Sequence, residues 1–340
     1  MKLFNPFLIK NVAFDNRIVI APMVPFGIAR LSNFAMSNPL LTHYSQLARN
    51  AAGLLVTQSL SVTPHPVHDS GVGIFHKDHI PALRTVVQAC HSYNTRLFAQ
   101  LAYPSTGFYQ GDSILGLSAL ELDTIAKQFI QAAWRCKQAG CDGIELHGAN
   151  SFFLNMLAAP ASNQRTDHYG GSLENRLRLV KTIVDGIREF SDENFILSYR
   201  MGCTNDPATD IQTAQALQRM GVELIHACSG ISSSSRLAVP PGFGFNAVVF
   251  MATVVAKHLD IPVIAVNNIS TLRRGNDLVE AGQCEFAAYG KPFLADPEFL
   301  VHAKENIDYQ PCLNCGRCQW FVDGSHCPAR RAKDNSPKII

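Results

Sequence analysis

The sequence predicts an α/β fold: a single (β/α)8 barrel of the TIM type, followed by a short cysteine-rich C-terminal extension. Three observations predict it. Eight short, continuously apolar segments recur along the chain, amphipathic helical segments separate several of them, and polar side chains follow nearly every apolar segment. An α/β barrel typically takes about 250 residues or more as one domain, so a chain of 340 residues does not require a second large domain.

The eight apolar segments have the character of buried parallel strands. Each is too short for a helix and too continuously apolar for a strand with one face in water. Along the chain they occupy residues 17–21, 53–57, 96–101, 143–147, 195–200, 224–227, 262–266 and 285–289. Eight parallel strands are the number that closes a TIM barrel. An open doubly wound sheet is the alternative, but no glycine-rich dinucleotide motif follows the first strand.

Helices are expected between these strands. Residues 124–139 and 173–190 both carry apolar side chains at the spacing of one helix face. Gly140, Gly221 and Gly282 stand where a helix would end and the next strand begin, and glycine suits the left-handed backbone of a helix cap. The chain thus alternates strand and helix, which is typical of a parallel sheet.

Composition and charge exclude several classes of partner. Lysine and arginine number 29 against 27 acidic residues, a formal net charge of +2 that offers no basic surface for nucleic acid. The N-terminus does not resemble a signal peptide, and no apolar run is long enough to span a bilayer. We therefore expect a cytoplasmic protein that acts on a small molecule, without nucleic acid or membrane. Whether it forms a homo-oligomer stays open.

Polar residues gather where the predicted strands end. The active sites of such barrels lie at the C-terminal ends of the strands. The polar residues in these positions are Gln58, Ser59, Gln100, His147, Asn150, Arg200, Ser229, Asn267, Asn268 and Lys291. A packed core would not need so many polar groups at one rim, so these positions predict a site.

Two stretches carry a resemblance to a known family. Residues 139–150 read AGCDGIELHGAN and residues 163–176 read NQRTDHYGGSLENR, with further matches at residues 16–23 and 290–297. The chain from Leu3 to about Leu300 resembles the Old Yellow Enzyme family of FMN-dependent oxidoreductases. The resemblance implies a barrel over residues 1–305 with FMN across its C-terminal mouth, and leaves residues 306–340 as the cysteine-rich extension.

The resemblance implies a role for each residue at the flavin. Arg200 would stabilise the negative charge of the reduced ring, and Gln100 would hydrogen-bond its pyrimidine edge. Other residues would line the ring, namely Pro22, Met23, Val24 and Ser59. The phosphate would lie against Asn267, Asn268, Gly290 and Lys291. Asn267 stands where the family has glycine, so its side chain must point away from the phosphate.

The same resemblance implies that His147 and Asn150 hold a carbonyl oxygen of the substrate. Two donors on that oxygen withdraw electrons from a conjugated C=C bond, so its β-carbon accepts hydride from the flavin. Phe152 stands where the family has a proton-donating tyrosine. Either water or Tyr103 would then supply the proton, or the natural reaction needs none on that face.

Four cysteines crowd together near the C-terminus. Cys312, Cys315 and Cys318 follow one another at two-residue gaps, and Cys327 comes next. The run resembles the [4Fe–4S] motif of 2,4-dienoyl-CoA reductase and trimethylamine dehydrogenase. Structural zinc, with His326 competing as ligand, and a run that holds no metal are the alternatives. A filled cluster would need an electron-transfer partner protein. The other six cysteines are interpreted as small buried hydrophobes.

These observations favour an FMN-dependent oxidoreductase that transfers hydride from NADH or NADPH, through FMN, to an electron-poor alkene or related small acceptor. One alternative is an FMN/iron–sulfur dehydrogenase that oxidises a small substrate and passes electrons to a partner protein. The other is a non-catalytic protein that binds flavin or an iron–sulfur cluster.

Overall fold

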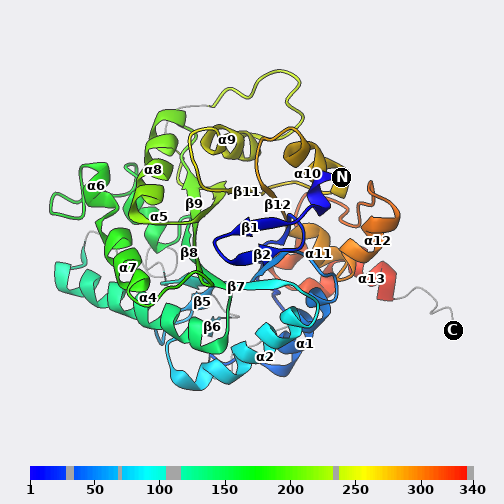
Figure 1. The fold of residues 1–340 in the computed structure, drawn as a ribbon, viewed down its shortest axis with the longest axis horizontal. Helices are drawn as coiled ribbons and strands as arrows, with labels where there is room; N and C mark the ends of the chain where they lie inside the picture. Colours follow the sequence, from blue (N-terminus) through cyan, green and yellow to red (C-terminus); the bar gives the residue numbers. More distant parts are fainter. Residues whose placement is uncertain (28–33, 68–70, 105–115, 233–236, 335–340) are drawn as a thin grey trace.

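Eight parallel strands close into a barrel in the computed structural model, which describes residues 1–27, 34–67, 71–104, 116–232 and 237–334 (Figure 1). The strands are β3 (Ile18–Ile20), β4 (Leu54–Val56), β7 (Arg96–Ala102), β8 (Gly143–Gly148), β9 (Ile196–Cys203), β10 (Leu224–Ser229), β11 (Val263–Ala265) and β12 (Phe286–Tyr289). Each pairs in parallel with the next, and β12 pairs with β3 to close the ring. Each coincides with one predicted segment, so the (β/α)8 prediction is confirmed.

The inward-facing side chains fill the N-terminal half of the barrel with apolar groups. Because side chains alternate along a strand, one set packs inside and the other against the helices. The inner set includes Phe98, Leu224 and Phe286. A hairpin of β1 (Phe7–Ile9) and β2 (Val12–Phe14) lies across this end, and the Phe14 ring packs against those of Phe98 and Phe286 (Figure 1). The N-terminal end is thereby closed, and any site must lie at the other end.

Helices surround the barrel. They are α1 (Asn38–Ala48), α2 (Ile80–His91), α4 (Ala119–Ala139), α5 (Phe153–Ala158), α6 (Leu173–Arg176), α7 (Arg178–Arg188), α8 (Pro207–Met220), α9 (Ala247–Ala256), α10 (Leu272–Glu280), α11 (Lys291–Ala295) and α12 (Phe299–Glu305). Gly140, Gly221 and Gly282 have φ values of 96°, 103° and 65°, which confirms their predicted left-handed conformation. The amphipathic segment 173–190 is interrupted at Leu177, where φ is −94° and ψ is 1°. Hydrogen bonds tie the flanking Arg176 to the carbonyl of Ala158 at the end of α5, and Arg178 to that of His168 in the following loop.

Two short strands and several 3-10 turns complete the described part of the chain. The strands β5 (Leu60–Ser61) and β6 (Val72–Gly73) extend the sheet beyond β7. The turns are η1 (Lys2–Phe4), η2 (Lys77–His79), η4 (Gln319–Phe321) and η5 (Gly324–His326). None of the described helices is both long and apolar enough to cross a membrane.

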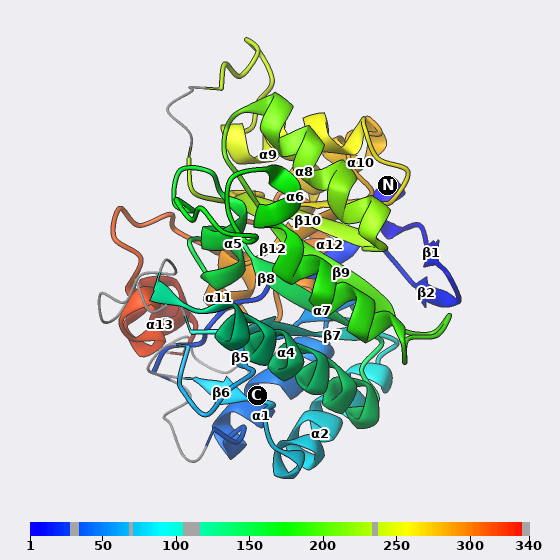
Figure 2. The same cartoon turned by 90° about the vertical axis from the view of Figure 1, so that its left-hand side faces the viewer.

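The C-terminal extension folds back beside the C-terminal ends of the strands. It contains η4, η5 and α13 (Pro328–Asp334), and it lies at the opposite end of the barrel from the β1–β2 hairpin (Figure 2). Trp320 packs with Leu294 and Cys327 in a small apolar cluster, and the Gly324 N–H donates to the Phe26 carbonyl at 2.8 Å. The extension is thereby fixed to the loop that follows β3.

Candidate functional site at the barrel mouth

A cavity of about 760 Å³ opens at the C-terminal ends of the strands. All predicted cofactor-binding residues line it, together with the predicted substrate-binding pair: Pro22, Met23, Val24, Ser59, Gln100, His147, Asn150, Arg200, Asn267, Asn268, Gly290 and Lys291. Among the described residues, the lining includes two permanent cations, Arg200 and Lys291, and no carboxylate. A cavity of this size and charge suits an anionic organic ligand.

Arg200 is the buried cation of this cavity. It lies near the end of β9, in register with His147 on β8 and with His226 on β10, and it is 8% exposed. Its Nη2 donates to Cys228 Sγ at 3.2 Å, whereas its buried Nε has no hydrogen-bond partner in the described part of the structure. A buried N–H without an acceptor costs about 1–3 kcal/mol. The guanidinium therefore fits a ligand that places an acceptor or a negative charge in the cavity, as reduced FMN would.

His147 lies on β8, one residue before the strand ends, and Asn150 lies in the sharp turn that follows; both line the cavity. Asn150 and Ser151 both have left-handed backbones, with φ of 54° and 61°, and the Asn150 N–H donates to the Ser229 carbonyl at 2.9 Å. His147 is 3% exposed, while Asn150 is exposed. The Phe152 ring stacks on the His147 ring with centroids 3.9 Å apart. An apolar ring thus covers one face of His147 and supplies no proton there.

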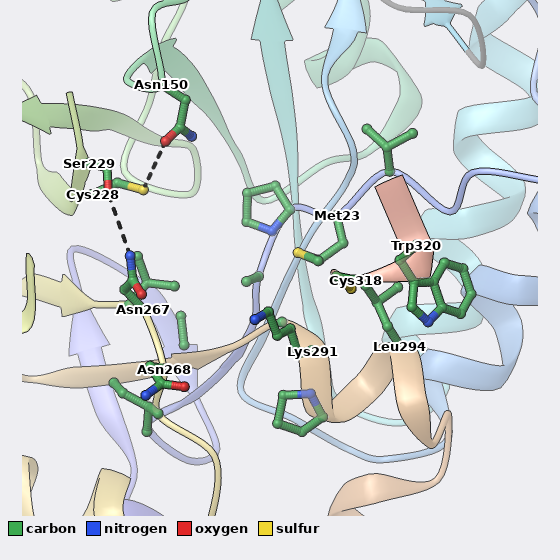
Figure 3. A pocket seen from close by; sticks show the side chains of 18 of the residues that line it. Met23, Asn150, Cys228, Ser229, Asn267, Asn268, Lys291, Leu294, Cys318 and Trp320 are labelled. Carbon is green, nitrogen blue, oxygen red and sulfur yellow. Dashed lines mark hydrogen bonds between the residues drawn. The ribbon is translucent and has the colours of Figure 1, made fainter. Parts of the chain in front are cut away.

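Cys228 belongs to the cavity, although the sequence analysis interpreted it only as a small buried hydrophobe. It is buried, as expected, but it accepts from Arg200 and its Sγ lies 3.7 Å from Asn150 Oδ1 (Figure 3). The alternation of side chains along β10 predicts that Cys228 faces the cavity. Leu224 faces the barrel interior, so the alternating residues His226 and Cys228 also face inward, and Cys228 comes last, at the mouth.

The loop after β11 contributes two consecutive asparagines with left-handed backbones. Asn267 has φ of 103° and Asn268 has φ of 55°, a conformation that asparagine tolerates better than most residues. The Asn267 side chain donates to Ser229 Oγ at 3.4 Å (Figure 3). It also accepts from Asn246 Nδ2 at 3.1 Å. These two bonds fix its direction. At Gly290 a side chain would contact Met23 Sδ at 2.8 Å, so only glycine fits there without a shift of Met23.

Tyr103 is not among the residues that line the cavity. It follows β7, is partly buried, and packs its ring 4.9 Å from that of Phe153. Burial and the nearby Glu121 raise the pKa of Tyr103, so its hydroxyl stays protonated at neutral pH.

The C-terminal extension forms one wall of the cavity. Its contribution consists of Gln310, Cys312, Asn314, Cys318, Trp320 and Phe321. The sequence predicts the extension after the barrel but does not predict that it lies over the mouth. Nothing in the sequence around exposed Phe321 and buried Trp320 predicts that the extension lies over the mouth. Its place there depends on a contact between distant residues, the hydrogen bond from Gly324 to Phe26.

The four C-terminal cysteines share a second, smaller pocket beside the main cavity. Cys312, Cys315, Cys318 and Cys327 all line it, and Cys315 is exposed while Cys327 is buried. Burial raises the pKa of Cys312, and the neighbouring Cys318 and Cys327 raise it further. Within the described ranges, however, no three cysteine, histidine or acidic side chains are arranged to hold a metal ion. The thiols as placed are neighbours but do not form a ligand set.

Comparison with known proteins gives consistent matches. The model of the NADH:flavin oxidoreductase / NADH oxidase family matches residues 2–110 and 109–310. An NADPH dehydrogenase of Bacillus pumilus is 29% identical over 332 residues, covering 90% of this chain and 95% of the relative. An NADH oxidase of Thermoanaerobacter brockii is 29% identical over 345 residues, covering 92% of this chain. The chain spans only 52% of that oxidase.

Solved structures share the fold. Morphinone reductase aligns over 91% of this chain and 90% of its own, with a TM-score of 0.73 and 22% identity. A 2-naphthoyl-CoA reductase complex aligns over 94% of this chain and 55% of its own, with a TM-score of 0.79 and 19% identity. At these identities the likeness establishes the barrel and its general layout.

Proposed function

Because the chain belongs to the NADH:flavin oxidoreductase / NADH oxidase family, we propose that its cavity binds FMN, which supplies hydride transfer from NADH or NADPH to an electron-poor alkene or related small acceptor. The observation that carries this proposal is Arg200. It is a buried cation whose Nε has no acceptor in the described structure, at the mouth of a cavity without carboxylates. Such a group stabilises negative charge on a bound ring more in the reduced state than in the neutral oxidised state.

The remaining cavity residues divide the work of binding. Arg200 and Gln100 would hold the pyrimidine side of the ring, and the loop after β3 and Ser59 would line it. Asn267, Asn268, Gly290 and Lys291 would hold the phosphate. Lys291 contributes charge without the two-pronged geometry of an arginine.

His147 and Asn150 bind and polarise the acceptor. Both line the same cavity, so one donor at the end of β8 and one in the turn after it are available to a single carbonyl oxygen. Phe152 has no proton to give, so protonation of the product falls to water or to Tyr103. Tyr103 does not line the cavity, which favours water as the proton source.

An anaerobic cycle tests this function. Protein containing FMN should lose its flavin absorbance when NADH or NADPH is added, and cyclohex-2-enone should restore it. A yellow protein that neither nicotinamide reduces would contradict the proposal. Colourless protein that FMN cannot reconstitute would leave only the non-catalytic alternative.

The second candidate is an FMN/iron–sulfur dehydrogenase that passes electrons to a partner protein. It is favoured by the four cysteines, two of which line the main cavity as well as the smaller pocket. Because their thiols as placed do not form a ligand set, a [4Fe–4S] cluster would require residues 312–327 to rearrange. An assay of iron, sulfide and zinc decides. Iron and sulfide in stoichiometric amounts, with no reduction by nicotinamides, would support this candidate, and protein free of iron would contradict it.

Two further expectations belong to the same proposal. The chain divides into a flavin-binding barrel over residues 1–305 and an extension over residues 306–340. A cytoplasmic location is supported by ten cysteines that are all free thiols, which suits a reducing compartment. Size-exclusion chromatography with light scattering would show whether the protein is a homo-oligomer.

A further inference from the structure

A buried carboxylate lies directly beneath the cavity and has no role in the function proposed above. Glu145 is on the inward face of β8, two residues before His147, and is fully buried. An ionised carboxylate is costly to bury unless its oxygens are hydrogen-bonded. Here both are: Gln100 Nε2 donates to Oε1 at 2.7 Å, and His226 Nδ1 lies 2.8 Å from Oε2.

The charge of Glu145 decides how its neighbours are oriented. Burial by itself raises the pKa of Glu145, but His226, the Arg200 charge and the Gln100 amide together outweigh it and lower the pKa. The carboxylate is therefore ionised and can only accept hydrogen bonds. Burial and the Arg200 charge together lower the pKa of His226 more than Glu145 raises it, so the imidazole is neutral and donates through Nδ1.

The consequence reaches the cavity through Gln100. An amide side chain carries one donor end and one acceptor end, and its direction follows from its partners. Because Nε2 must face the carboxylate, Oε1 is the end left for the cavity that Gln100 lines. No described residue donates to Oε1. Without an anion at position 145 the amide could turn either way.

We propose that Glu145 is a positioning residue, which holds the Gln100 amide with its oxygen toward the cavity. The site then selects a ring that presents an N–H donor at that edge. This inference rests on the proposed function, because in FMN the donor on the pyrimidine edge is N3–H. Arg200, a pure donor, faces the same cavity, so the two side chains together offer one acceptor and one cation to the ring.

The test compares the dissociation constants of FMN and 3-methyl-FMN for protein from which flavin has been removed. The methyl group removes the N3–H donor. The parent protein should bind 3-methyl-FMN about tenfold more weakly or worse, because a buried acceptor would lose its hydrogen bond. In Glu145→Gln the Gln100 amide is free to turn. The ratio of the dissociation constant of 3-methyl-FMN to that of FMN should then fall to about threefold or less.

A matched control is Asp142→Asn. Asp142 is also a buried acid that accepts hydrogen bonds, but it lies just before β8, at the closed end of the barrel. It should keep the parent ratio. His226→Gln should keep it as well, since glutamine can still donate to Glu145.

Two results would overturn the inference. One is a Glu145→Gln protein with the parent ratio. The other is parent protein that binds FMN and 3-methyl-FMN equally. This measurement needs no variant, so it remains decisive even if Glu145→Gln fails to fold. Parent protein that binds neither flavin is a different result, because it overturns the proposed function itself.

Discussion

Replacing Arg200 with alanine should make the bound FMN harder to reduce. The guanidinium is 8% exposed, so water screens its charge poorly, and its Nε has no partner in the described structure, which leaves a donor for the ring. The oxidised ring is neutral and the reduced ring is an anion, so the cation favours the reduced state. A pair of unit charges about 4 Å apart is worth about 4 kcal/mol at an effective dielectric constant of about 20.

Relaxation of the variant and entry of water would reduce that loss, and we expect about 2–4 kcal/mol to remain. For a two-electron couple, about 30 mV corresponds to about 1.4 kcal/mol, so the midpoint potential should fall by about 40–90 mV. The assay is equilibration of the protein with a redox dye during slow enzymatic reduction, followed by absorbance. Arg200→Lys is the matched variant, because it keeps the charge and should recover most of the potential. An unchanged potential in Arg200→Ala would refute the role assigned to this residue.

Three further predictions concern other parts of the molecule. Phe152→Tyr should raise steady-state turnover with cyclic enones by about tenfold or more, because it supplies a proton donor beside the substrate pair; rates equal to the parent would count against that diagnosis. Burial lowers the pKa of His43 from 6.5 to about 4, so stability present above pH 6.5 should be lost as the pH falls through 4. In His43→Leu that acid loss, about 3 kcal/mol by denaturant unfolding, should disappear, whereas exposed His168→Leu should retain it. Gly140→Ala should cost about 1 kcal/mol of unfolding free energy because of its left-handed backbone, and Gly316→Ala, in open space, should cost nothing measurable.

The barrel could be predicted because its physical demands are local. A strand buried on both faces must be apolar at every position, and a helix that turns directly into a strand favours glycine at its cap. All eight strands and the caps at Gly140, Gly221 and Gly282 follow from those two requirements. The cavity residues also follow, since a closed parallel barrel brings every C-terminal strand end to one rim.

The parts that were missed depend on contacts between distant residues. The hydrogen bond of Glu145 with His226 joins two residues that are 81 positions apart, on strands that are not neighbours in the barrel. No sequence pattern around either residue predicts this pairing. The extension reaches the mouth through the contact of Gly324 with Phe26, for which no periodicity exists. Cys228 is different, because the alternation of inward and outward side chains along β10 would have predicted that it faces the cavity.

The break at Leu177 shows the same limit on a smaller scale. The apolar spacing of residues 173–190 is helical throughout, and both halves are helical in the structure. The interruption coincides with tertiary hydrogen bonds of the two flanking arginines, Arg176 and Arg178, to the carbonyls of Ala158 and His168. The spacing of apolar residues predicts which helix face is buried, but it does not predict hydrogen bonds to distant parts of the chain.

The flavin content of the purified protein decides whether the barrel-mouth cavity is an FMN site. Denaturation should release FMN, identified by chromatography, at one molecule per chain, and the flavin-free protein should take up the same amount again. Protein that contains no FMN and does not bind it when it is supplied would contradict the assignment of the barrel-mouth cavity.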